Sequence, residues 1–380
     1  MSWLPLTEAQ AGIWYAQARD PGSPVFMTGQ ALHIHGPLDA CAMARAVDRL
    51  GQEAECLSLR FRVGDDGPQQ RLDPRGAPRL VLRADVAPDE IQAALQAEAR
   101  TPVDLLQGPV AGFTLWRLGP RQHVLSERIH HIAADGQAMV QITRRLAALY
   151  EAERTGTDAG EGPTPFARAL DEDARFAAAP ARTRQRDFWH GQLADLPPVE
   201  SPAVRAADGC GRWFHRAEAP LPEGTGAAVA HLAETAGAHW TDVLTALTGA
   251  YVARHLASVA SGAASDVVLG IPLQNRMGRV ARTPSTQVNV LPLHLVIDET
   301  APLADWLRGA AARLAAMRRN SRYRGEALQR ELGRIGAGRR LWGPLVNILP
   351  FDACPPLAGC DTRLQILGAG SVDDITFCFR

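Results

Sequence analysis

The stretch His130-His131-Ile132-Ala133-Ala134-Asp135-Gly136 joins a run with strand-like alternation, Gln122 to Ile129, to a run with helical periodicity, Gln137 to Tyr150. Adjacent residues of a strand point to opposite faces, so one histidine faces a cleft while the other faces the protein interior. A neutral imidazole that takes a proton near pH 7 is the usual general base in acyl transfer. The stretch therefore predicts one base, one packed histidine, and one carboxylate, Asp135, that fixes the turn before the helix.

Two other interpretations of this stretch stay open. A histidine in a strand is often a hydrogen-bonded structural residue, and local sequence alone does not separate that role from catalysis. A metal site is the second alternative. Two histidines on opposite strand faces do not easily share one ion, and the sequence has no Cys/His cluster with ligand spacing. We therefore expect no metal here.

Further motifs along nearly the whole chain resemble, in family order, those of the condensation domains of nonribosomal peptide synthetases. The second histidine of an HHxxxDG motif is the family's functional residue, which points to His131. The other matching stretches are Leu6-Thr7-Glu8-Ala9-Gln10-Ala11-Gly12-Ile13-Trp14, Leu57-Ser58-Leu59-Arg60-Phe61, Asp187-Phe188-Trp189, Gly270-Ile271-Pro272 with Arg276, Asn289-Val290-Leu291-Pro292-Leu293, Gly343-Pro344-Leu345-Val346-Asn347-Ile348 with Phe351-Asp352, and Gly370-Ser371-Val372-Asp373-Asp374. The last two look most like siderophore synthetases.

The resemblance implies a fold that the alternation of helical and strand-like runs does not specify. Alternation alone predicts two α/β domains. The family resemblance implies two chloramphenicol-acetyltransferase-like lobes that form a V-shaped pseudo-dimer. We place the N-terminal lobe, with the HHxxxDG motif, at residues 1–175 and the C-terminal lobe at 176–380. Family chains run further, so the second lobe looks truncated. We expect Asp374–Phe379 to cross back and pair with the first lobe.

The resemblance also implies a reaction. A condensation domain forms an amide bond between an acyl or aminoacyl thioester on a carrier protein and an amine acceptor, with His131 as base or as positioning residue. The domain binds no cofactor of its own. Its substrates arrive on the phosphopantetheine arms of donor and acceptor peptidyl carrier proteins, and an adenylation domain is the expected neighbour. The alternatives are a stand-alone acyl-CoA-type acyltransferase of the same fold and a non-catalytic recruitment module.

Other site residues follow from the same motifs. Asp135 and Arg276 are expected to form a structural ion pair, because a buried lone carboxylate is costly and a guanidinium fork matches it bidentately. Gly136 either permits a tight turn and brings a backbone N–H near the oxyanion, or is simply a helix-start glycine. His130 is expected to be packed. Asn289 and Asn347 either line the substrate tunnel or satisfy buried backbone groups.

Composition narrows the class of protein. The 380 residues fit two domains, and a hydrophobic content of 46% suits a buried core. A net charge of −1 argues against a nucleic-acid partner. The chain has no lysine, which excludes a lysine nucleophile and a P-loop. Its six cysteines are scattered and no apolar run reaches membrane length, so we expect a cytoplasmic protein with reduced thiols and no membrane partner.

Overall fold

The structure is a computed structural model that describes residues 2–84, 86–197, 199–200, 202, 213–259, 266–276, 278–334, 340–349, 354–372 and 374–380. Residues that lie outside this part include Cys210, Phe351, Asp352 and Asp373. The chain forms two compact units. Unit 1 comprises Met1–Arg175, Arg276–Gln287 and Asp352–Ser371, and unit 2 comprises Phe176–Asn275, Val288–Phe351 and Val372–Arg380. We expected two contiguous lobes divided at residue 175, whereas Arg276–Gln287 and Asp352–Ser371 from the second half belong to unit 1.

Unit 1 is built on a five-stranded sheet of order β11-β2-β7-β6-β5. Its strands are β2 (Met27–His35), β5 (Leu80–Arg83), β6 (Ala111–Gly119), β7 (Gln122–His130) and β11 (Asp361–Ala369). The pairs are antiparallel except for β5 with β6. A three-stranded sheet of order β1-β4-β3 adds β1 (Leu4–Pro5), β3 (Leu59–Gly64) and β4 (Gly67–Leu72). The site motif follows β7, the central strand of the larger sheet.

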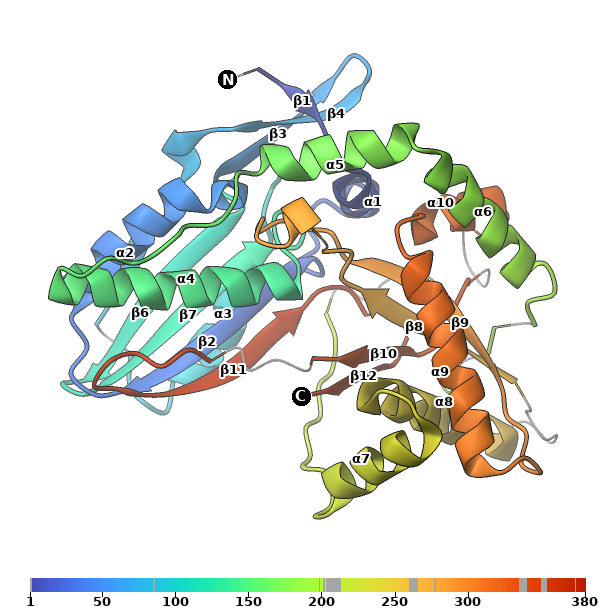
Figure 1. Cartoon of the computed structure of the whole chain (residues 1–380). Helices are drawn as coiled ribbons and strands as arrows, with labels where there is room; N and C mark the ends of the chain where they lie inside the picture. The colour runs from blue at the N-terminus through green and yellow to red at the C-terminus, as the bar shows by residue number, and fades with distance from the viewer. Residues whose placement is uncertain are drawn as a thin grey trace. The chain divides into compact units, whose positions relative to one another are not determined.

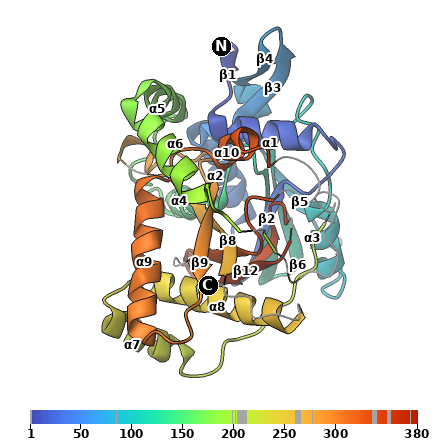
Figure 2. The ribbon, with the colours of Figure 1, turned by 90° about the vertical axis from the view of Figure 1, so that its right-hand side faces the viewer.

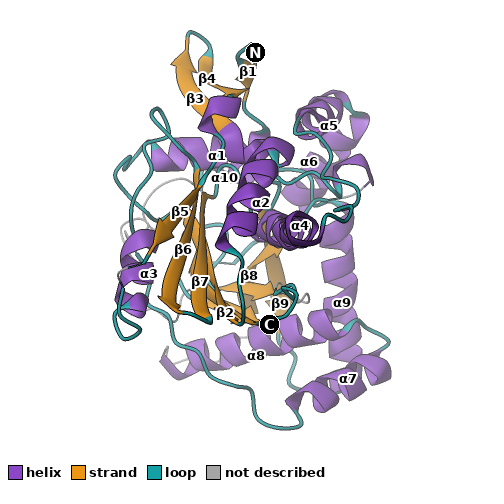
Figure 3. Cartoon of the chain, turned by 90° about the vertical axis from the view of Figure 1, so that its left-hand side faces the viewer, coloured by secondary structure: helices purple, strands orange, loops and turns teal. Residues whose placement is uncertain are grey.

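Helices cover both faces of the larger sheet in unit 1. Figure 3 shows α3 (Ile91–Ala99) on one face and α2 (Ala40–Glu53) and α4 (Gly136–Thr155) on the other. Both faces of β7 are therefore buried, and the core between β7 and α4 contains Leu125, Ile129, Ile142 and Leu146. The remaining helical segments are α1 (Glu8–Gln17), η1 (Glu55–Ser58), η2 (Pro74–Gly76), η3 (Gly278–Val280) and the start of α5 (Ala167–Ala178).

Unit 2 has its own sheet and its own core. The sheet has the order β12-β10-β8-β9, with β8 (Asp266–Leu273), β9 (Asn289–Val296), β10 (Leu345–Ile348) and β12 (Thr376–Phe379). Its helices are α6 (Pro180–Leu193), α7 (Thr225–Ala236), α8 (Trp240–Val259), α9 (Leu303–Arg319) and α10 (Gly325–Glu331). Figures 1 and 2 show α8 and α9 packed beside β8 and β9. Val243, Leu269 and Leu314 are among the buried core residues.

The last two strands correct one expectation. Asp374–Phe379 was expected to pair with the first lobe, but β12 pairs in parallel with β10 of unit 2. The strand that returns to unit 1 is the preceding one, β11, which pairs antiparallel with β2 from Asp361 opposite His35 to Ala369 opposite Thr28. The expectation identified the return of the chain but placed it one strand too late.

No helix within the described part of the chain is both long enough and apolar enough to cross a membrane. Five cysteines, Cys41, Cys56, Cys354, Cys360 and Cys378, are free thiols.

Candidate active site

His130, the last residue of β7, is packed in the interior of unit 1. Its side chain is 1% exposed. The ring Nδ1 accepts the N–H of Ile132 at 3.1 Å, so the ring proton lies on Nε2, which contacts Gln17 Oε1 at 3.1 Å. Burial, together with the neighbouring His131, lowers the pKa of His130 to about 3. Both nitrogens are satisfied in the neutral ring, and a second proton would point Nδ1–H at another N–H.

His131 follows β7, and its backbone is held on two sides. Its N–H donates to the carbonyl of Phe26 at 2.8 Å, and its carbonyl accepts the hydroxyl of Thr286. Its side chain is partly exposed, and Nδ1 has no hydrogen-bond partner among the described residues. Burial lowers the pKa of His131 below its ordinary value, against the opposing effect of the Asp135 carboxylate. The imidazole is therefore neutral at pH 7 and able to accept a proton.

Gly370 packs against the His131 ring. An added Cβ at this position would lie 2.6 Å from Cδ2 and 3.2 Å from Nε2 of His131, and the glycine has a φ of +93°. Only glycine combines this left-handed conformation with such a close approach at low cost. Gly370 therefore sets one wall of the space in which the imidazole sits.

Asp135 begins α4 and anchors it. Its Oδ1 accepts the N–H of Ala138 at 3.0 Å as an N-cap, and its Oδ2 accepts Arg276 Nη1 at 2.7 Å and the N–H of Gln287 at 2.9 Å. The side chains are 3% exposed for Asp135 and 4% for Arg276. The expected ion pair is present, but not as a two-armed fork, because the second arm of Arg276 donates to the Ser285 carbonyl.

Burial alone would raise the pKa of Asp135, but the Arg276 guanidinium and the hydrogen bonds from Arg276, Gln287 and Ala138 together hold it below its ordinary value. The carboxylate is therefore charged at neutral pH. It ties the start of α4 to the segment Arg276–Gln287, and the same segment supplies Thr286 to the His131 carbonyl.

Gly136 is the first residue of α4 and is exposed. Its φ is not positive, and an added Cβ would meet nothing within 4 Å among the described residues. The tight turn that we expected does not require glycine here. Gly136 is therefore a helix-start glycine, and its backbone N–H is open to approach.

Asn289 and Asn347 belong to unit 2. Asn289 is 1% exposed, and its amide donates to the carbonyls of Ser321 at 2.7 Å and Tyr323 at 2.8 Å while accepting the Gly325 N–H at 3.0 Å. All three contacts hold the turn before α10, so this side chain satisfies backbone groups, as the second interpretation proposed. Asn347 lies partly buried in β10, opposite Cys378 of β12.

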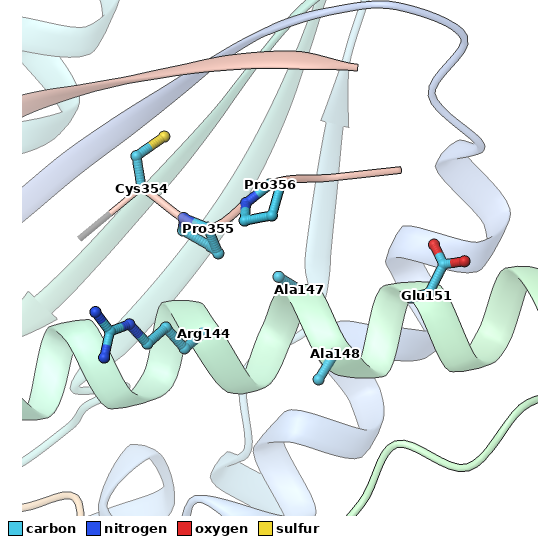
Figure 4. Close-up of a pocket in the computed structure, with 7 residues that line it drawn as sticks. All are labelled: Arg144, Ala147, Ala148, Glu151, Cys354, Pro355 and Pro356. Atoms are coloured by element: carbon cyan, nitrogen blue, oxygen red, sulfur yellow. The ribbon is translucent and has the colours of Figure 1, made fainter. Parts of the chain in front are cut away.

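The described residues contain no metal centre, and the pocket beside α4 is formed by residues other than this cluster. Within the described residues, no group of three or more His, Cys, Asp or Glu side chains is arranged to hold a metal ion. Figure 4 shows a pocket of about 480 Å³ between α4 and the segment 354–356, lined by Arg144, Ala147, Ala148, Glu151, Cys354, Pro355 and Pro356. None of the predicted site residues is among these lining residues.

The sequence did not point to every residue of the cluster. Thr286 and Phe26 hold the backbone of His131, and no local pattern marks either of them. In the sequence, Gly370 stands out only as part of the family motif that begins at this residue. Its role against the imidazole depends on the return of β11 to the sheet, which brings it beside a residue more than two hundred positions earlier in the chain.

Comparison with known proteins identifies the family. A model of the condensation domain matches residues 2–352. A dimodular nonribosomal peptide synthase of Bacillus subtilis (strain 168) is 34% identical over 377 residues, covering 98% of this chain and 16% of that protein. Enterobactin synthase component F of Escherichia coli O157:H7 is 30% identical over 385 residues, covering 98% of this chain and 29% of that protein.

Solved structures agree with this result. A double mutant of the starter condensation domain of rhizomide synthetase, in complex with C8-CoA and Leu-SNAC, superimposes with a TM-score of 0.88 at 28% identity, covering 99% of this chain and 85% of that one. VibH, a condensation enzyme, gives a TM-score of 0.83 at 25% identity, covering 99% and 87%. The chain therefore belongs to the condensation-domain family, the amide-forming acyltransferases of nonribosomal peptide synthetases. Condensation domains have a two-lobe, acetyltransferase-like fold, and this chain forms two compact units.

The first prediction concerns the buried ion pair. Arg276→Ala strands the Asp135 carboxylate in the interior, and Asp135→Ala strands the guanidinium, so each should cost roughly 3–5 kcal/mol of unfolding free energy. Urea denaturation measures this loss. The control is Arg308→Ala, whose ion pair with Asp305 is exposed on both sides (58% and 61%) and should change stability by less than about 1 kcal/mol. Equal effects of Arg276→Ala and Arg308→Ala would contradict the assignment.

The second prediction follows from the His130 tautomer. Because the folded-state pKa is lowered from 6.5 to about 3, the unfolded chain binds a proton in this range that the folded protein rejects. The stability from this group is present above pH 6.5 and is lost as the pH falls, by up to about 1.4 kcal/mol per pH unit. His130→Gln should remove this component. Urea denaturation at several pH values between 6.5 and 4.5 tests it, and parallel curves for the two proteins would refute it.

The third prediction tests the contact between Gly370 and the imidazole. Gly370→Ala should displace the His131 ring and lower amide formation by at least about tenfold, since small misplacements of a reacting group are costly. Gly359→Ala is the matched control. Gly359 also has a positive φ, +75°, but an added Cβ would meet only Pro37 Cγ at 4.0 Å. If both variants lose the same activity, backbone strain and not the ring contact is responsible.

Proposed function

We propose that this domain joins an acyl or aminoacyl group, held as a thioester on the phosphopantetheine arm of a donor carrier protein, to an amine on an acceptor carrier protein. The amine nitrogen attacks the thioester carbonyl carbon, the carbon–sulfur bond breaks, and the donor thiol leaves. The proton lost by the amine reaches the departing thiolate through His131. The domain supplies mainly position and proton transfer, because the thioester is already activated.

The observation that carries this proposal is the state of His131. Its ring is neutral at pH 7 because burial lowers its pKa, its side chain is partly exposed, and its backbone is held by Phe26 and Thr286. A general base needs both a free lone pair and a fixed position. His130 lacks the first of these, because Nδ1 accepts the Ile132 N–H and Nε2 carries the proton.

Gly136 is proposed as the second site residue. Its backbone N–H lies at the start of α4, where helix N–H groups have no partner within the helix and the helix dipole is positive. An oxyanion formed at the thioester carbonyl is stabilised by such a group. The open space beside the Gly136 Cα supports a close approach of the substrate.

The partners of the domain are proposed from its relatives. This chain spans 16% and 29% of the two curated synthetases described above. We infer that donor and acceptor carrier proteins dock on the domain, that an adenylation domain adjoins it in the full polypeptide, and that it binds no cofactor of its own. Asn347 is kept as a residue of the substrate tunnel, whereas the three backbone contacts of Asn289 argue against that role for it.

The test is an intact-mass assay with an acyl-loaded donor carrier protein and an aminoacyl-loaded acceptor. Amide formation transfers the acyl mass to the acceptor. Product formed equally well from acyl-CoA and a soluble amine would favour the stand-alone acyltransferase, and tight binding of a partner without any product would favour a recruitment module.

The fourth prediction is that His131→Ala lowers amide formation by about 10²–10⁴-fold without loss of the fold, as removal of a general base does. Circular dichroism checks the fold, and the mass assay checks the rate. His190→Ala is the control, because His190 is 39% exposed and pairs with Glu331 on the surface of unit 2. A loss of only two- or three-fold in His131→Ala would remove this residue from the role of base.

A further inference from the structure

Glu127 is a buried carboxyl group that the proposed reaction does not use. It lies on β7, is 0% exposed, and occupies the face of the sheet that α4 covers. Its Oε2 lies 2.7 Å from Gln30 Nε2 of β2 and 2.7 Å from Thr143 Oγ1 of α4, while Oε1 has no partner among the described residues. A single carboxyl oxygen therefore connects β2, β7 and α4.

The number of hydrogens at this cluster depends on whether Glu127 carries a proton. Four close contacts need a hydrogen: Gln30 with Glu127 (2.7 Å), Gln30 with Thr143 (2.5 Å), Thr143 with Glu127 (2.7 Å), and Thr143 with the Met139 carbonyl (2.9 Å). The Gln30 amide supplies two hydrogens and the Thr143 hydroxyl one. If Glu127 is ionised, one contact has no hydrogen. If Glu127 is protonated on Oε2, it donates to Thr143, Thr143 donates to Met139, and all four contacts are hydrogen bonds.

The electrostatic surroundings agree with a protonated carboxyl. Burial raises the pKa of Glu127 to about 7, and only the hydrogen bonds from Thr143 and Gln30 oppose this effect. No charged group of the described residues on β2, β6 or α4 contributes to this shift. Its register partners are Gln30 on β2 and Phe113 on β6, and both are uncharged.

The cluster lies on both sides of the turn that carries His131. Glu127 is four residues before His131, on the strand that leads into the turn, and Thr143 is in the second turn of the helix that leaves it. We propose that the hydrogen-bonded proton on Glu127 fixes β7 against α4 and thereby positions His131, which makes Glu127 a positioning residue for amide formation. The proposal rests on the function proposed for His131. Glu127 does not touch the reacting atoms.

Two consequences for pH follow. Between about pH 4.5 and 7 the folded protein holds a proton that the unfolded chain has released, so this group's contribution to stability falls as the pH rises through that window and is constant above it. Above pH 7 the Glu127 carboxyl loses its proton in the folded protein as well. The contact between Thr143 and Met139 then lacks a hydrogen and the cluster holds an unpaired charge, so α4 is held less firmly against β7.

The experiment compares the wild-type domain with Glu127→Gln, which is uncharged at every pH. Nuclear magnetic resonance of the histidine rings follows the position of His131, assigned by its loss in His131→Ala. We expect the wild-type His131 signals to shift with a midpoint near pH 7 and those of Glu127→Gln to lack this step. The ring's own titration, whose pKa burial lowers, occurs in both proteins, so the comparison with Glu127→Gln isolates the step due to Glu127. The ratio of amide formation by Glu127→Gln to that by the wild type should rise about tenfold from pH 6 to pH 8, as the protonated fraction of a group with pKa about 7 falls.

Two further variants test the arrangement. Glu98→Gln is the matched control, because Glu98 accepts hydroxyl hydrogen bonds from Thr114 (2.6 Å) and Ser126 (2.5 Å) on the opposite face of the same sheet. It should leave the His131 step unchanged. Thr143→Val removes the hydroxyl that contacts Glu127 Oε2, so the midpoint should move away from the wild-type value, and Thr143→Ser should restore it.

Identical His131 titrations in the wild type and Glu127→Gln would overturn the proposal, as would a constant ratio of rates. If the wild type formed no amide at any pH while the His131 step still depended on Glu127, the positioning role would stand and the proposed reaction would fail.

Discussion

The ion pair between Asp135 and Arg276 is the interaction on which the rest of the site depends. It is buried on both sides, and it connects the first turn of α4 to a segment that lies far along the chain. The same carboxylate caps α4 through Ala138 and binds the Gln287 N–H. It is one of the contacts that fix the start of the helix and the segment that supplies Thr286 to His131. Replacement by an apolar pair would fill the volume but would not orient these backbone groups.

The composition of unit 1 follows from this constraint. A contiguous first lobe would contain the HHxxxDG motif but only some of the residues that hold it, because Arg276, Thr286 and Gly370 come from the second half of the sequence. The return of the chain through β11 adds an edge strand to the sheet beside β2 and delivers Gly370 to the imidazole. The active-site residue is local in sequence, whereas its support is long-range.

This difference explains which parts the sequence predicts. The strand Gln122–Ile129 and the helix after the motif are confirmed as β7 and α4, because alternation and helical periodicity are local signals. β2 was not predicted. Its sequence, MTGQALHIH, alternates only over Leu32–His35, because most of the strand is buried on both faces and it carries Gln30 toward Glu127. The ion pair was predicted from the cost of burying a lone carboxylate and from the family resemblance, whereas the contacts of Thr286 and Gly370 have no local signal.

The titratable groups around the motif differ in charge because their hydrogen-bond partners differ. His130 and His131 are both held neutral by burial, but only His130 has both ring nitrogens engaged. Asp135 is kept charged, because a guanidinium and two N–H groups face it. Glu127, with an amide and a hydroxyl as its partners, has no cation among the described residues to stabilise its charge. Burial therefore leaves His131 neutral, Asp135 charged and Glu127 with a raised pKa, according to the hydrogen-bond partners that each group meets.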